Sequence, residues 1–206
     1  MRISQTMIAG VVAVTMLAVS VAGCGGKPTS STTKSGSATS ATSSSSSAPT
    51  SSAPAKPSDY TGLLIRATDI SAPEPFNSTP PTNNPNGQPG VATTFSTQDG
   101  SHVIRVTIQV LADPAAATNA LNSAKAGEGN TIKDPHTDPA NVGTGGTTLS
   151  GNSPDGSKGL TILLFTEGRA LITMEFDGPP GMLAPQDYVI PTGQKQDAAV
   201  KKGLDG

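Results

Sequence analysis

The stretch LTILLFTEGRALITMEFD, residues 160–177, decides the fold. Its two apolar halves flank Glu167-Gly168, which suits a tight turn, so the stretch predicts two antiparallel strands joined as a hairpin. In the second half, Ile172, Met174 and Phe176 recur at every other position, which predicts one buried face. The first half is apolar at consecutive positions. It is therefore expected to be buried on both faces, at the centre of a sheet.

A second strand signal lies upstream of this hairpin. Ile104, Val106, Ile108 and Val110 alternate with polar residues, which predicts a strand with one buried face. Asp99-Gly100 precedes it and follows a moderate strand over residues 91–97. The pair has the composition of a two-residue type I′ turn, so a second hairpin is expected here.

Two helices are expected to accompany these strands. Asp113-Pro114 supplies an N-cap and a proline at the first helical position, and the helix is expected to end before Gly127. Its stripe of small apolar residues is Ala117, Leu121 and Ala124. The second helix is expected near the C-terminus, capped by Thr192 and stopped by Gly203.

The remaining segments complete an α+β domain. Residues 142–149 predict a glycine-softened strand, residues 63–70 a short strand or helical turn, and residues 71–90, with six Pro and four Asn, an irregular loop. The order β-β-α-β-β-β-α favours an antiparallel sheet of about five strands with two helices packed on one face. This single domain spans residues 59–206.

The N-terminus carries an export signal. After Met1-Arg2, an apolar run from residue 7 to 22 is too short for a bilayer span but suits a signal peptide. It ends in Val21, Ala22 and Gly23, followed by Cys24, and this resembles the lipobox of bacterial lipoproteins. The resemblance implies a signal peptide over 1–23, recognition of Val21, Ala22 and Gly23 by the signal peptidase, and lipidation of Cys24. An ordinary secretory signal and an uncleaved membrane helix are the alternatives.

A disordered tether is expected after the lipidated cysteine, so that residues 24–58 separate the anchor from the domain. Residues 27–58 hold 13 Ser and 6 Thr in 32 positions and no large apolar residue, so they have nothing to bury. The domain that follows holds 15 acidic and 9 basic residues, a net charge of 9 − 15 = −6. That balance excludes nucleic acid as an expected partner, because neutralising phosphates needs clustered cations.

Neither the histidines nor the glycine-rich stretch predicts a metal site or a phosphate-binding loop. His102 follows the Asp99-Gly100 turn, and His136 stands within Asp134-Pro135-His136-Thr137-Asp138, where three candidate metal ligands alternate. A metal site there would need a second cluster, which the sequence lacks, so a solvated acidic loop is favoured. The stretch Gly143-Thr144-Gly145-Gly146 lacks the Lys-Ser/Thr of a P-loop. A loose strand or turn is favoured there.

Paired carboxylates and aromatic residues are the remaining candidates for a catalytic or ligand-binding site. Glu175 and Asp177 share one strand face, as two acids for glycoside chemistry would, but the spacing is equally common on an exposed strand. No Gly-x-Ser-x-Gly occurs. There is no Trp, and the two tyrosines, Tyr60 and Tyr188, predict no stacking platform. The sequence therefore predicts a protein that is not an enzyme and uses no cofactor or metal.

Taken together, the lipobox, the Ser/Thr/Ala/Pro tether and the small domain resemble actinobacterial, mycobacterial-type cell-envelope lipoproteins, in particular the LpqN/LpqT-like lipoproteins. The specific match covers residues 21–24, and extracellular sensor-like lipoproteins are a second possibility. The chain departs from the first group in lacking Trp and from the second in lacking disulfide cysteines. The resemblance implies an envelope binding or accessory role and assigns no residue of the domain.

The expected function is thus a binding or accessory module in the cell envelope. It is expected to be held at the cell membrane through the lipid on Cys24, on the extracytoplasmic side, with an unidentified envelope protein or ligand as partner. A lipid or small-ligand carrier is the alternative, although 34 large apolar residues among 148 leave few to line a big cavity. A metal-binding protein or hydrolase comes third.

The anchor can be tested directly. Cys24→Ala removes the thiol that would carry the lipid, so we expect it to abolish incorporation of labelled palmitate and to block maturation of the precursor. Metabolic labelling followed by electrophoresis measures both effects. A variant that still took up the label would contradict the lipobox interpretation.

Overall fold

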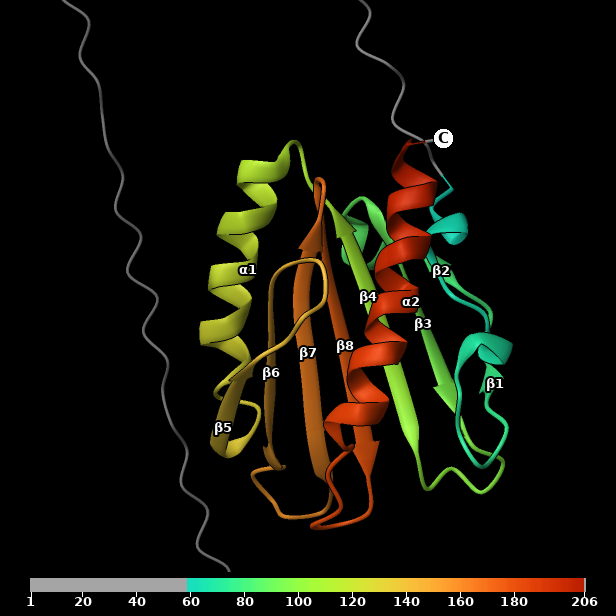
Figure 1. The fold of residues 1–206 in the computed structure, drawn as a ribbon, viewed down its shortest axis with the longest axis vertical. Coiled ribbons are helices and arrows are strands. Elements are labelled where there is room, and N and C mark those ends of the chain that lie inside the picture. Colours follow the sequence, from blue (N-terminus) through green and yellow to red (C-terminus); the bar gives the residue numbers. More distant parts are fainter. Residues whose placement is uncertain (1–58, 206) are drawn as a thin grey trace, which may run out of the picture. The chain divides into compact units, whose positions relative to one another are not determined.

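A computed structural model of the chain describes residues 59–205 as an open sheet with helices on both faces (Figure 1). Two α-helices, α1 (Pro114–Glu128) and α2 (Gln186–Asp205), accompany an antiparallel sheet in the order β1-β3-β4-β8-β7-β6-β5, with β2 paired to β3. The strands are β1 (Asn77–Ser78), β2 (Thr82–Asn83), β3 (Gly90–Ser96), β4 (Val103–Val110), β5 (Lys133–Pro139), β6 (Thr144–Asn152), β7 (Gly159–Glu167) and β8 (Ala170–Gly178). The 3-10 helices are η1 (Thr61–Leu63), η2 (Ala67–Asp69) and η3 (Pro85–Gly87).

The α+β class and the five expected strands are confirmed, as β3, β4, β6, β7 and β8. Three further strands raise the total to eight. The strands β1 and β2 are two-residue pairings within the proline-rich segment, too short to leave a periodic pattern. The strand β5 lies at the sheet edge and is polar, with its register broken by a bulge between Lys133 and His136, so it also lacks hydrophobic alternation.

The prediction that both helices pack on one face of the sheet is wrong. The strand β7 is buried on both faces, as expected, and its alternating residues serve two separate cores. Leu163 and Phe165 pack in the core that includes Val189 and Val200 of α2. Ile162 and Leu164 pack on the other face with Leu121 of α1. Both sheet faces are therefore covered, because β7 has an apolar surface to bury on each.

The C-terminal helix begins earlier than its capping signal predicts. Instead of starting at Thr192, α2 starts at Gln186 and continues through Pro191. Thr192 is buried inside the helix, and its hydroxyl donates to the carbonyl oxygen of Tyr188. Proline interrupts helical hydrogen bonding, but burial of Val189 and packing of Tyr188 on Phe176 favour the extra turn. The helix α1, by contrast, is capped by Asp113 as expected and buries Ala117 and Leu121.

The turn at Asp99-Gly100 is also longer than predicted. The strands β3 and β4 are joined by residues 97–102, and the Asp99 carboxylate accepts from the Ser101 N–H and from the hydroxyls of Thr97 and Ser101. These bonds, the backbone one first, lower the pKa of Asp99 to about 2. Asp155 is bonded in the same way within residues 153–158, between β6 and β7. An aspartate that organises a six-residue loop replaces the two-residue turn.

The N-terminal part of the domain is fastened to α2. Gln196 is fully buried; its amide nitrogen donates to the Leu63 carbonyl oxygen at 2.6 Å, and its amide oxygen accepts from the Ile65 N–H at 3.3 Å. Lys195 donates to the carbonyl oxygen of Asp69 and to the hydroxyl of Ser71. The segment 60–71 is therefore held against the helix by polar bonds as well as by its apolar side chains. Within residues 59–205, no helix has the length and apolar character to cross a membrane.

Replacing the buried glutamine tests this fastening. In Gln196→Leu, two buried backbone groups lose their partners, each worth roughly 1–3 kcal/mol, so we expect the free energy of unfolding to fall by about 2–4 kcal/mol. Urea denaturation measures the change. The neighbouring exposed Gln194 makes one bond at the surface, to the Asn141 carbonyl oxygen, so Gln194→Leu should cost less than about 1 kcal/mol. Equal losses in both variants would contradict the assigned role of Gln196.

Candidate ligand-binding pocket

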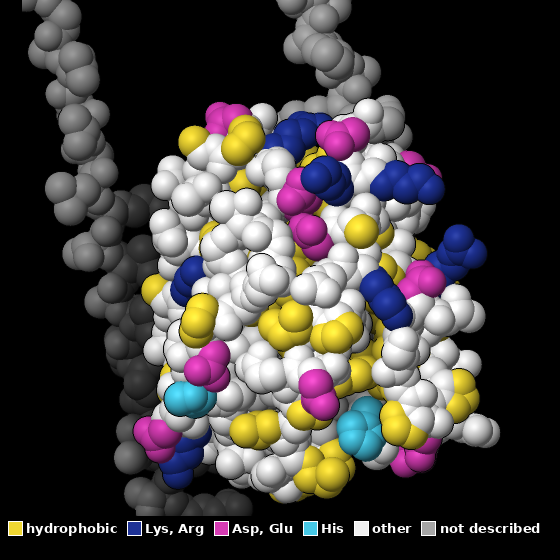
Figure 2. Space-filling model, viewed as in Figure 1, with side chains coloured by type: hydrophobic (Ala, Val, Ile, Leu, Met, Phe, Trp, Pro, Cys, Tyr) yellow, Lys and Arg dark blue, Asp and Glu magenta, His cyan; other side chains and the backbone are white. Residues whose placement is uncertain are grey.

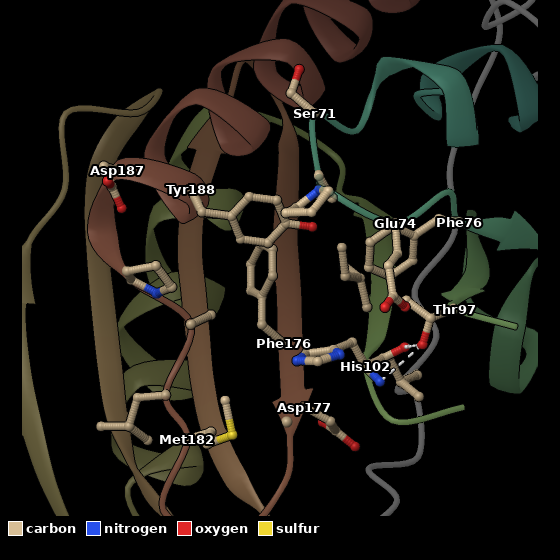
Figure 3. Close-up of a pocket in the computed structure, with 18 residues that line it drawn as sticks. Ser71, Glu74, Phe76, Thr97, His102, Phe176, Asp177, Met182, Asp187 and Tyr188 are labelled. Atoms are coloured by element: carbon tan, nitrogen blue, oxygen red, sulfur yellow. Dashed lines mark hydrogen bonds between the residues drawn. The ribbon is translucent and has the colours of Figure 1, made fainter. Parts of the chain in front are cut away.

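A pocket of about 520 Å³ opens at one end of the domain. One wall is the first turn of α2, another is the proline-rich segment 71–76, and the floor is formed by the adjoining ends of β4 and β8 (Figure 3). The loop 178–185, between β8 and α2, contributes the rim. A volume of this size is within the roughly 300–1,000 Å³ range of small-molecule sites.

Three aromatic rings line the pocket: Phe76, Phe176 and Tyr188. The whole chain has only six aromatic residues, four Phe and two Tyr, so half of them gather here. The rings of Phe176 and Tyr188 meet edge to face, with centroids 5.9 Å apart. Figure 3 shows this pair on the side of α2 and Phe76 across from it. This grouping could not be predicted from the sequence, because Phe76, Phe176 and Tyr188 lie on three separate segments that only the fold brings together.

The Tyr188 hydroxyl is a buried polar atom without a hydrogen-bond partner among the described residues. Its burial raises the pKa of Tyr188 to about 12, so the group remains a neutral phenol over the physiological range. An unpartnered buried hydroxyl is unfavourable by roughly 1–3 kcal/mol. A hydroxyl can act as both donor and acceptor, and this one is buried in a residue that lines the pocket.

The rim loop carries two large apolar side chains that are exposed to solvent. Met182 is 57% exposed and Leu183 44% exposed, and both line the pocket. The loop is held close to the sheet end because Gly159 and Gly178 have no Cβ, where a Cβ would strike the Met182 backbone. Figure 2 shows yellow apolar side chains at the lower end of this face, interspersed with acidic ones.

Charged side chains at the pocket are acidic. Glu74 stands on the proline-rich segment, and His102 lies near it at the start of β4 (Figure 3). Asp187, on the first turn of α2, lies on the other side of Tyr188 from both, and Asp177, at the end of β8, also lines the pocket. Neither Glu74 nor Asp187 forms an ion pair within residues 59–205. No Lys or Arg is among the residues that line the pocket.

The carboxylates singled out in the sequence, Glu175 and Asp177, lie together on the sheet face that α2 does not cover. Arg105 bridges them, at 2.6 Å to Glu175 and 2.8 Å to Asp177, and Lys158 also binds Asp177, at 2.7 Å. Burial opposes ionisation of Asp177, but hydrogen bonds from Lys158 and Arg105 outweigh it and lower its pKa. Burial and the neighbouring Asp177 raise the pKa of Glu175. This geometry is that of an ion-paired cluster on a sheet surface.

The other sequence candidates are scattered. His136 and Asp138 approach each other at 3.2 Å on the exposed edge strand β5, and the bulge beside them holds Asp134 at a positive φ of 49°. Residues 143–146 open β6 through a register shift. Within residues 59–205, no three His, Cys, Asp or Glu side chains are grouped as metal ligands would be. Cys24 and the recognition residues Val21, Ala22 and Gly23 lie outside the described residues.

Comparison with known proteins adds no assignment: no protein-family model matches the chain, and no curated protein matches it in sequence.

The ion-paired cluster yields a prediction with opposite signs at its two carboxylates. Asp177 is only 4% exposed and its pKa is lowered, so its contribution to stability is present above the ordinary aspartate pKa of 3.8 and is lost as the pH falls below it. We expect Asp177→Asn to lower the free energy of unfolding by about 1–3 kcal/mol at pH 7, and by less at pH 3.

The matched variant is Glu175→Gln. Because the pKa of Glu175 is raised, its ionised form is disfavoured by folding, and the stability it contributes is lost as the pH rises through its pKa. Glu175→Gln should therefore leave stability at pH 7 unchanged or increased. Urea unfolding at both pH values measures the four differences, and equal destabilisation by the two variants would contradict the assigned pKa directions.

Proposed function

We propose that the protein is an extracytoplasmic binding module, anchored to the cell membrane through the lipid on Cys24, and that its domain binds an apolar group in the pocket beside Tyr188. The single observation that supports binding most strongly is the pocket itself, a volume of about 520 Å³ that gathers half of the aromatic residues of the chain. The anchor and the export signal rest on residues 1–24 alone.

The pocket favours a small ligand, so the carrier function gains support. The low count of large apolar residues argued against a sizeable cavity, but proline and alanine line much of this one, at positions 72, 73, 184 and 185. Few large side chains are therefore needed, because the backbone and small side chains form the walls. Recruitment of a protein partner by the exposed Met182 and Leu183 is the second candidate.

Catalysis has less support at this site. The polar groups at the pocket are Glu74, Asp177, Asp187, His102 and hydroxyls. The Nδ1 atom of His102 lies 2.9 Å from the Ser101 hydroxyl. Within residues 59–205, neither a hydrogen bond nor an ion pair connects His102 to a carboxylate. A nucleophile oriented by a base is the usual sign of covalent catalysis. The Ser101 hydroxyl beside His102 donates to the Asp99 carboxylate within the loop 97–102, and Ser101 does not line the pocket.

Binding is tested with the neutral fluorophore N-phenyl-1-naphthylamine, whose emission rises in an apolar environment. The protein used is the chain from residue 24 with Cys24→Ser, so that no acyl group is attached. We expect saturable enhancement with the wild-type pocket. Ala72→Phe places a phenyl group at the pocket wall and should reduce the enhancement at least about tenfold.

Ala115→Phe is the matched control. Ala115 is exposed on the first turn of α1, on the opposite face of the sheet, so a phenyl group there should leave binding unchanged. Circular dichroism and thermal unfolding establish that both variants fold. Absence of saturable binding, or equal loss in the two variants, would refute the pocket as a binding site.

A further inference from the structure

The pocket combines aromatic rings with carboxylates that have no counter-ion, and this combination indicates what kind of ligand fits it. We propose that the pocket binds an amphipathic molecule whose apolar body lies among the rings and whose head group is a positively charged ammonium. This inference rests on the proposed function, since it names the chemistry of the ligand bound at the same site.

The first argument is the local charge balance. Glu74 brings a negative charge to the pocket, and Figure 3 shows its carboxylate on the side that faces His102 and Thr97. Asp187 lies apart from it, on the other side of Tyr188. Since neither carboxylate has an ion-pair partner in the part of the chain that the structure describes, their charges are uncompensated. A cationic group placed beside Glu74 would be attracted by it, whereas an anionic one would be repelled.

The nearby cations are already bound elsewhere. Lys158 and Arg105 approach the sheet end, but both bind Asp177, itself a lining residue, and Arg105 also binds Glu175 on the face opposite α2. Lys195 donates to Ser71, at the end of the pocket wall farthest from Glu74 in Figure 3, and its second bond goes to the Asp69 carbonyl oxygen. The head group of an anionic amphiphile would thus find no free ammonium or guanidinium at the lining.

The aromatic lining supports the same choice of ligand. The faces of Tyr and Phe rings carry negative electrostatic potential and attract ammonium groups, at roughly 0.5–2 kcal/mol per contact depending on desolvation. Phe76 and Tyr188 supply such rings at the pocket, while Phe176, only 3% exposed, packs edge to face on Tyr188. The net charge of −6 over residues 59–206 adds a long-range field of the same sign.

The test compares three probes that share an octyl chain and differ in head group: octyltrimethylammonium, octyl glucoside and octanoate. Each is titrated below its critical micelle concentration, at low salt, into the chain from residue 24 carrying Cys24→Ser. Amide chemical shifts around Thr97, His102 and Tyr188 report binding. We expect the cation to bind about tenfold more tightly than octanoate, with octyl glucoside between them.

Charge variants separate the pocket from the general field. Glu74→Gln should reduce the preference for the cation about two- to threefold, because it removes the carboxylate that faces His102 and Thr97. The control Asp134→Asn removes one charge on the exposed edge strand β5 and should leave the preference unchanged. The positive φ of Asp134 is one that Asn also adopts, so the control variant is expected to fold.

The outcomes distinguish this inference from the proposed function. Tight binding of octanoate, or equal effects of Glu74→Gln and Asp134→Asn, would overturn the cationic head group while leaving an apolar-binding pocket in place. Failure of all three probes and of N-phenyl-1-naphthylamine would refute the pocket as a site, and the inference with it. A preference for the cation that depends on Glu74 supports both.

Discussion

The structure depends on β7 being buried on both of its faces. An antiparallel sheet ordinarily has one apolar face and one that meets water, but Leu163 and Phe165 on one side of β7, and Ile162 and Leu164 on the other, require cover on both. The helix α1 covers one side and α2 the other. Because α2 must lie across β7 and β8 on the face that carries Phe176, its first turn is brought to the sheet end where the pocket opens.

The second wall of the pocket depends on a polar contact. The segment 60–71 is held to α2 by the buried amide of Gln196 and by Lys195, which bonds to Ser71 at the beginning of the pocket wall. The residues that follow, 72–76, contain two prolines and therefore cannot collapse into a regular element that would fill the space. A stretch that resembles a featureless loop in the sequence is thus a fixed wall, fastened at its first residue.

The sequence was informative where one face or one cap determines the local structure. The alternation in β4 and β8, the doubly apolar β7 and the Asp113 cap of α1 all follow from local patterns, so five strands and the α+β class could be predicted. It was uninformative where an element depends on contacts with residues distant in the sequence. The polar β5 is a strand only because β6 offers it an edge, and α2 begins before its proline because Tyr188 and Val189 bury against the sheet. The pocket is of the second kind, since its aromatic residues come from three separate segments.

The pocket and the first described residues lie at different ends of α2. Leu63 packs against Gly203, near the C-terminal end of α2, whereas Tyr188 lies in the first turn of the same helix. The fifteen residues between positions 188 and 203 correspond to about 22 Å along a helix axis. The first described segment, around Leu63, therefore lies toward the opposite end of α2 from the pocket.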